Sequence, residues 1–247
     1  MIDRITDEIR NHLKDNAPIL NEDQISRMYK ILNSDNPNFV GYGNKHSEIE
    51  KFVRSIQNKY NLSYDDASNI FNRLIKSSIH DEKIAGLFLL NRFKKNFNEK
   101  TVDMVQEVIP KNFDTWAITD TTMIRVVGPF LAKSGNEKLA EKTIKEWSVS
   151  ENLWVRRAAL VILLKNIMVK KDFNNDDVFK LVERMRKDPE DYIQKGIGWL
   201  LKTCSNYKPE IIYNYLMKNK ERLSRLILRY ASEKLSKEKR AIILKKS

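Results

Sequence analysis

The segment Arg157–Leu164 reads Arg-Ala-Ala-Leu-Val-Ile-Leu-Leu, an apolar run that recurs in similar form at four other places in the chain. The aligned positions are Ala85, Ile124, Ala158, Ile197 and Ala231. Their successive spacings are 39, 34, 39 and 34 residues, which is the period of helical repeats whose paired helices bury their apolar faces only by stacking. The pattern predicts an all-α helical-repeat solenoid with a concave groove.

The rest of the chain also has helical character. Only seven glycines and six prolines occur in 247 residues, and no strand-like alternation interrupts the spacing of apolar residues. We predict one domain, 1–247, with less regular helices in 1–80 and regular helix pairs in 80–247. The expected N-terminal helices are 5–13, 22–32, 47–60 and 64–76, the last with Ser63 as N-cap. We interpret 33–45, which contains Gly41 and Gly43, as a helix connection, with close approach to a ligand as the alternative.

Charge and cysteine content limit the class of protein. A net charge of +12, spread along the chain, favours an anionic partner such as nucleic acid and a basic groove. A single cysteine, Cys204, fits a reducing compartment. His12, His46 and His80 are too far apart in sequence to suggest a metal site. The polar N-terminus and the lack of a long apolar run lead us to expect a cytoplasmic protein without membrane contact.

Two segments carry residues suited to a cationic ligand. Trp116 and Asp120 are four residues apart, so a helix places the indole and the carboxylate on one face. Trp199, in the run Ile197–Lys202, could add a second aromatic surface, whose π face attracts cations. The alternatives are an N-cap role for Asp120 and a core role for Trp199. Trp147 and Trp154 are interpreted as packing residues.

Basic side chains accompany these segments. Arg156 and Arg157 open one apolar repeat, and Lys195 and Lys202 flank Trp199. If they line the groove, they would neutralise phosphates and give salt-sensitive, sequence-independent affinity. For any one of these residues, solvation of an outer helix face remains the alternative.

The order of several segments resembles the AlkD-type family of DNA alkylation-repair glycosylases, over almost the whole chain. The segments that carry the resemblance are Tyr42–Lys45 with Glu48–Ile49, Trp116–Asp120, Trp154–Arg157 and Ile193–Lys202. Where this family commonly has an arginine, the chain has Lys202, which keeps the charge but loses the bidentate fork.

The resemblance implies a HEAT-like repeat fold, right-handed in type, and a metal-independent hydrolase that removes positively charged alkylpurines from DNA. It implies Asp120, Trp116 and Trp199 as the catalytic group. It also implies DNA contacts, which we assign to Tyr42, Lys45, Arg156, Arg157, Lys195 and Lys202.

Our leading hypothesis is therefore a DNA glycosylase of base excision repair that needs no metal or other cofactor. Its partner would be double-stranded DNA carrying alkylated purines, and we expect a monomer in the nucleoid-associated cytoplasm. The alternative is a non-catalytic helical-repeat module that binds nucleic acid or protein through the same groove.

Overall fold

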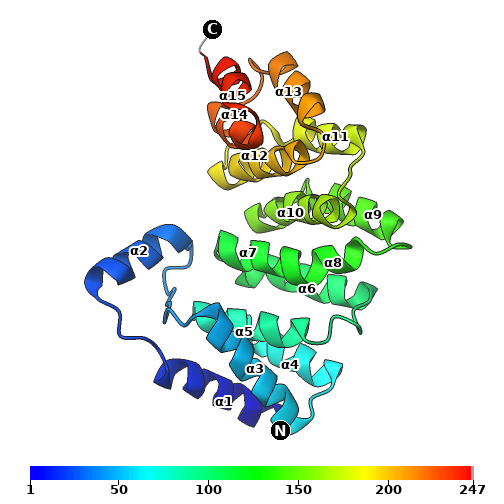
Figure 1. Cartoon of the computed structure of the whole chain (residues 1–247). Helices are drawn as coiled ribbons and strands as arrows, with labels where there is room; N and C mark the ends of the chain where they lie inside the picture. The colour runs from blue at the N-terminus through cyan, green and yellow to red at the C-terminus, as the bar shows by residue number, and fades with distance from the viewer. Residues whose placement is uncertain (246–247) are drawn as a thin grey trace. The chain divides into compact units, whose positions relative to one another are not determined.

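Helices account for nearly all of the regular structure in the computed structural model, which describes residues 1–245 (Figure 1). Within those residues the only β-type pairing is an isolated parallel bridge between Val40 and Ile79. The all-α prediction is confirmed. The chain forms two units, 1–130 and 131 onward, which are described separately below.

The first unit contains the less regular N-terminal helices and the first regular pairs. Its helices are α1 (Ile2–Asp15), α2 (Glu22–Leu32), α3 (His46–Tyr60), α4 (Tyr64–Leu74), α5 (His80–Asn91), α6 (Glu99–Asn112), α7 (Trp116–Thr122), a π turn at Met123–Val127, and α8 (Gly128–Leu131) at its boundary. The four predicted N-terminal helices are all present, and Ser63 caps α4 by accepting the backbone N–H of Asp66.

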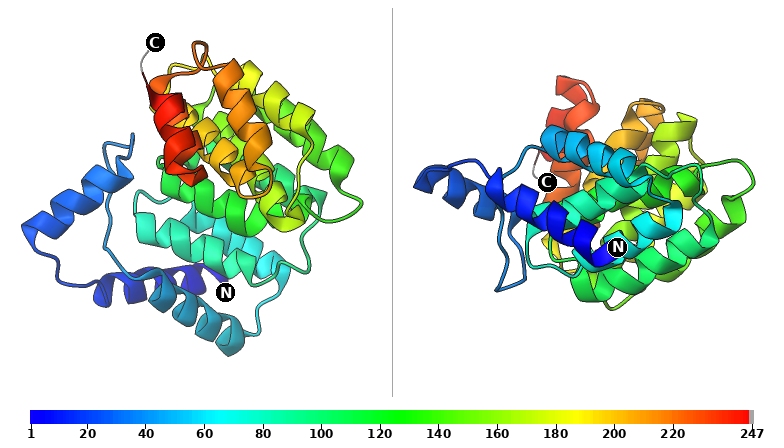
Figure 2. Two further views of the ribbon diagram at one scale, coloured as in Figure 1. Left: turned by 45° about the horizontal axis from the view of Figure 1, so that its top comes forward. Right: turned by 90° about the horizontal axis from the view of Figure 1, so that it is seen from below.

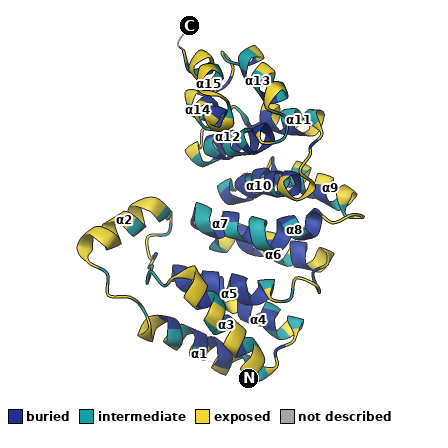
Figure 3. Ribbon diagram, in the orientation of Figure 1, coloured by how far each residue is buried: buried dark blue, intermediate teal, exposed yellow. Residues whose placement is uncertain are grey.

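Helix α5 is the central helix of the first unit. It packs against α3 and α4, and every residue from His80 to Leu90 is buried (Figure 3). A helix that is apolar around most of its circumference is expected to be surrounded by other elements. The predicted repeat position Ala85 is fully buried in it.

A π turn follows α7 where the repeat pattern predicted an ordinary helix. The N–H of Gly128 reaches back five residues to the carbonyl of Met123. Pro129 lacks an N–H and its ring would clash with the carbonyl four residues earlier, which explains why the helix widens here. The buried position in this segment also differs from the predicted one by one residue. The repeat position Ile124 is only half-buried, whereas Met123 is fully buried.

Helix α2 differs from the other helices of its unit because none of its residues is buried. Figures 1 and 2 show it set apart from the remainder of the first unit, and Figure 3 shows it exposed along its length. A complete capping box formed by Asn21 and Gln24 stabilises its N-terminus. The capping box is thus a local source of stability for a helix that buries no residue.

The second unit consists of regular helix pairs. Its elements are α9 (Glu137–Trp147), α10 (Leu153–Lys170), α11 (Asn175–Met185), α12 (Asp191–Ser205), α13 (Pro209–Lys218), α14 (Arg225–Ala231), the 3-10 turn Ser232–Lys234 and α15 (Lys237–Leu244). The repeat positions Ala158, Ile197 and Ala231 are fully buried in α10, α12 and α14. Trp147 and Trp154 are buried, as predicted for packing residues.

Helix α12 carries a glycine at a close helix contact and a buried cysteine. Gly198 allows α12 and α14 to approach closely, because a β-carbon at this position would overlap Cβ of Tyr230. Cys204, also on α12, is fully buried, and this burial raises the pKa of its thiol to about 12. No helix in the described part of the chain is long and apolar enough to cross a membrane.

Candidate functional site

Helix α7 carries the first two predicted catalytic residues. Thr115 is its N-cap, with its hydroxyl oxygen accepting the N–H of Ile118 at 3.2 Å. Asp120 lies one turn further along and is 7% exposed, so the alternative in which Asp120 caps the helix does not apply. Trp116 is half-buried at the first helical position and shares a face with Asp120.

The indole of Trp116 is held by α2. Its Nε1–H donates to the backbone carbonyl of Ile31 at 2.9 Å. That carbonyl belongs to the last turn of α2, where carbonyls have no partner within the helix. Since the N–H is engaged, Trp116 can meet a ligand only through its ring face or its carbon edge.

Four consecutive polar residues open α5, and all of them are buried: His80, Asp81, Glu82 and Lys83. Asp81 accepts the backbone N–H groups of Tyr42 and Asn44, each at 2.8 Å. Glu82 pairs with Arg10 of α1 at 3.2 Å. The sequence patterns did not single out Asp81, Glu82 and Lys83, although a polar quartet preceding the apolar run of a central helix is an unusual pattern.

Lys83 forms a deeply buried ion pair in the first unit. Its ammonium lies 2.7 Å from Asp114 Oδ2 and donates to the carbonyl of Asn112 at 2.6 Å. The two side chains are 3% and 7% exposed. This pair fixes the turn that leads from α6 into α7, and hence the start of the helix that carries Trp116 and Asp120.

Residues 33–45, here called the α2–α3 strap, carry two of the predicted DNA contacts. Asp81 holds Tyr42 through its backbone, and burial together with the carboxylates of Glu82 and Asp81 raises the pKa of the Tyr42 phenol. Lys45 is exposed at the N-cap of α3. Gly43 has φ of 81°, a conformation that favours glycine.

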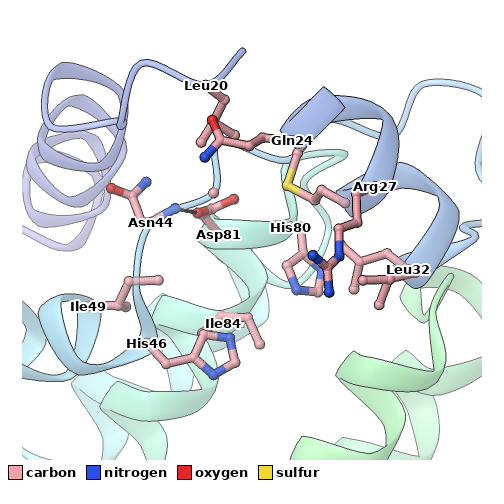
Figure 4. A pocket seen from close by; sticks show the side chains of 13 residues that line it. Leu20, Gln24, Arg27, Leu32, Asn44, His46, Ile49, His80, Asp81 and Ile84 are labelled. Carbon is pink, nitrogen blue, oxygen red and sulfur yellow. Dashed lines mark hydrogen bonds between the residues drawn. The ribbon is translucent and has the colours of Figure 1, made fainter. Parts of the chain in front are cut away.

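A cavity of about 450 Å³ lies between α2, the strap and α5 (Figure 4). Its polar lining includes Arg27, Asn44 and His80, and its apolar lining includes Met28 and Ile84. Burial lowers the pKa of His80 to about 4, so its imidazole is neutral at pH 7. Neither Trp116 nor Asp120 lines this cavity.

The remaining predicted site residues belong to the second unit. Trp199 is half-buried on α12. Lys202, one turn further along, pairs with Glu233 at 2.5 Å, and Lys195 lies 3.9 Å from Asp191 with its side chain 37% exposed.

The two arginines that open α10 have different environments. Arg156 pairs with Asp188 at 2.6 Å and donates to the carbonyl of Glu151 at 2.7 Å. Arg157 is 6% exposed and donates to the carbonyl of Tyr192 at 2.6 Å. In this arrangement Arg157 joins α10 to α12 from inside the protein, whereas Arg156 remains half-exposed.

The predicted residues therefore fall into two groups. Trp116 and Asp120 lie on one helix of the first unit, close to the strap that carries Tyr42 and Lys45. Trp199 and the other basic candidates belong to the second unit. Residues 1–245 contain no cluster of three or more histidine, cysteine, aspartate or glutamate side chains placed to hold a metal ion.

Comparison with protein families gives a match to the DNA alkylation repair enzyme family over residues 9–235. The chain belongs to this family. No protein with a curated description matches it. The family assignment supports a role in DNA alkylation repair and implies that the protein binds DNA.

Solved structures support the helical-repeat fold of this family member. A predicted DNA alkylation repair enzyme from Enterococcus faecalis is 21% identical, with a TM-score of 0.74, covering 88% of this chain and 97% of its own. AlkD2 from Streptococcus mutans is 17% identical, with a TM-score of 0.56, covering 86% and 97%. At these identities the likeness concerns the fold.

Proposed function

We propose that this protein is a DNA glycosylase that hydrolyses the N-glycosidic bond of positively charged alkylpurines in duplex DNA without a metal ion. The observation that carries the proposal is the buried carboxylate of Asp120, one helical turn from Trp116, in a member of a DNA alkylation repair family. A nucleoid-associated location in the cytoplasm and a monomeric state go with this proposal.

The chemistry requires one carboxylate. An alkylated purine already carries a positive charge, so the bond between its nitrogen and C1′ breaks with the electron pair moving to the base, which leaves neutral. The deoxyribose then develops oxocarbenium character, which Asp120 stabilises electrostatically. Water adds to C1′, and Asp120 orients it and accepts its proton.

The electrostatic effect of Asp120 on the rate can be estimated from Coulomb's law. Two unit charges about 4 Å apart interact by roughly 4 kcal/mol at an effective dielectric of about 20. That energy corresponds to a rate factor on the order of a thousand. Asp120 alone therefore supplies a useful part of the rate enhancement.

The aromatic residues would hold the sugar and the lesion against this carboxylate. Trp116 would use its ring face, because its N–H is engaged by Ile31. Trp199 is proposed as the second aromatic surface on the basis of the family resemblance.

The DNA backbone would be held by exposed or half-exposed polar and basic side chains. We retain Tyr42, Lys45, Arg156, Lys195 and Lys202 for this role. Arg157 is not retained, because its guanidinium is buried and engaged by Tyr192.

The decisive test is release of free methylated base from methylated duplex DNA, in the presence of a chelator. Wild-type protein should release base, whereas Asp120→Asn should lose at least about a hundredfold in rate with its affinity for DNA retained. A parallel loss of DNA binding would instead point to a scaffold role for Asp120. If wild-type protein binds DNA but releases no base, the alternative of a non-catalytic DNA-binding module replaces the proposal.

A further inference from the structure

The ion pair between Lys83 and Asp114 is an unusual choice for the interior of a helical unit. Removing two charges from water costs more than their mutual attraction often returns, so apolar residues of similar size commonly give equal or greater stability. Here both side chains are more than nine-tenths buried. A role other than stability is the natural reason for keeping such a pair.

The pair holds the segment that precedes α7 at two points. The Lys83 ammonium donates to the Asn112 carbonyl at 2.6 Å and to Asp114 Oδ2 at 2.7 Å. Asn112 ends α6 and Asp114 directly precedes Thr115, the N-cap of α7. Trp116, the first residue of α7, follows two residues after Asp114. Any shift of the 112–114 turn would therefore move the indole of Trp116.

The same aspartate also holds the α2–α3 strap. The side-chain amide of Asn36 donates to Asp114 Oδ2 at 3.3 Å, and the backbone N–H of Asp35 donates to the Asp114 carbonyl at 3.2 Å. Further along the strap, Asp81 holds the backbone N–H of Tyr42. Asp81 and Lys83 are two residues apart on α5, so one rigid helix anchors both the strap and the start of α7.

We infer that the buried Lys83–Asp114 pair is a positioning element that sets the orientation of Trp116 and Asp120 and couples it to the strap that carries Tyr42. Neither Lys83 nor Asp114 touches substrate in this scheme. They act through the 112–114 turn, and the inference rests on the proposed function for its catalytic consequence. The coupling would let contact between DNA and the strap influence the helix that carries the reacting carboxylate.

The test replaces the pair by apolar residues, Lys83→Met with Asp114→Leu, because such a replacement is expected to fold. The readout is the indole N–H region of a ¹⁵N-labelled protein, with the Trp116 signal assigned through Trp116→Phe. We expect the Trp116 signal to shift. The signals of Trp147, Trp154 and Trp199, which all belong to the second unit, should stay in place and serve as internal references.

A control removes a different ion pair that involves α5. Arg10→Met with Glu82→Leu deletes the charge pair between α1 and the residue before Lys83, and neither side chain hydrogen-bonds to the 112–116 segment. This control should leave the Trp116 signal unchanged. A shift of equal size in both variants would show general loosening of α5 and would overturn the inference.

The second readout is single-turnover base release at saturating duplex DNA. The Lys83→Met with Asp114→Leu variant should lose about 10- to 100-fold in rate, with its dissociation constant for DNA changed less than about twofold, because misplacement by about 1 Å has this effect on rate. A folded variant with an unmoved Trp116 signal and wild-type release would overturn the inference. If the wild-type protein releases no base, the proposed function fails, whereas the indole spectrum still tests the positioning.

Discussion

Single residues in this protein gain their significance from partners that are distant in sequence. Lys83 and Asp114 are separated by 31 positions, and Trp116 and Ile31 by 85. The first pair joins the N-terminal turn of α5 to the turn before α7, and the second joins the start of α7 to the last turn of α2, where carbonyl groups lack partners within the helix. The proposed catalytic helix is thus held by contacts that no local pattern reveals.

Breaking the ion pair on one side only should be costly. Lys83→Met leaves Asp114 as a buried charge without its counterion, which we expect to destabilise the protein by about 3–5 kcal/mol. Urea unfolding would measure this loss. The double variant Lys83→Met with Asp114→Leu should recover most of the loss; equal losses in the two variants would mean that the charge imbalance is not the cause.

His80 should make the stability of the protein fall in mild acid. Its pKa is about 4 in the folded protein and about 6.5 in the unfolded chain, so only the unfolded state takes up the proton between these values. This effect of His80 on the unfolding free energy is absent above about pH 6.5. As pH falls toward 4, it lowers the unfolding free energy progressively, by about 1.4 kcal/mol per pH unit at most.

Chemical denaturation at several pH values, with His80→Phe as the comparison, isolates this effect. His12 and His46 also have lowered pKa values and shift stability in the same direction, so only the difference between the two proteins reports His80. As pH falls from 6.5 to 4, the unfolding free energy of the wild-type protein should decrease relative to that of His80→Phe. A constant difference over that range would contradict the prediction.

Among the helices of the first unit, α5 and α2 differ most clearly in burial. Helix α5 is buried along nearly its whole length, whereas α2 buries no residue. Helix α2 is stabilised locally by its N-terminal capping box, and it is held to its unit by the Trp116 indole and by Tyr29, whose hydroxyl donates to the Phe39 carbonyl. Local opening is cheapest where few apolar contacts are lost.

Hydrogen exchange should therefore be fastest in α2 and slowest in α5 within the first unit. Replacing Trp116 by phenylalanine removes the indole N–H that holds the Ile31 carbonyl, so exchange in the last turn of α2 should speed up further. Exchange mass spectrometry on peptides from both helices would measure this. Equal protection of α2 and α5 would show that α2 has stabilising contacts beyond these.

Close packing of α12 on α14 depends on Gly198. An alanine there would place its β-carbon against Cβ of Tyr230, which cannot move without its backbone, and we expect a loss of about 1–3 kcal/mol. Gly196→Ala is the matched control, because its β-carbon would meet the flexible end of Leu160 and should cost less. Thermal unfolding of both variants would measure the two losses in stability. A loss of stability in Gly196→Ala equal to or larger than that in Gly198→Ala would contradict the prediction.

For the molecule as a whole, the sequence was sufficient to predict the fold class, but it did not predict the long-range contacts that hold the site residues. Repeat spacing predicted the helices, because apolar periodicity reflects burial directly. It placed Ile124 one position away from the buried Met123, since a π turn leaves no periodic signal. The roles of Asp81 and Lys83 were missed because long-range pairing is invisible in one sequence. Buried Arg157 could not be told from half-exposed Arg156, because charge does not reveal burial.

The net charge of +12 predicts DNA affinity that weakens with salt, and Lys202 offers a local test of that property. If Lys202 contacts a phosphate, Lys202→Ala should flatten the log–log salt dependence by about one unit or less. Glu233→Gln should strengthen binding, because it releases Lys202 from its ion pair. Fluorescence anisotropy across a salt series would measure both, and an unchanged slope in Lys202→Ala would remove Lys202 from the interface.

The burial of Cys204 has a practical chemical consequence. With a pKa of about 12 and no exposed surface, this thiol has almost no reactive thiolate at neutral pH. Toward maleimide reagents the protein should therefore behave as if it had no cysteine. A cysteine introduced at exposed Lys45 would then take up a single fluorophore, which gives an optical reporter on the strap without any prior removal of native thiols.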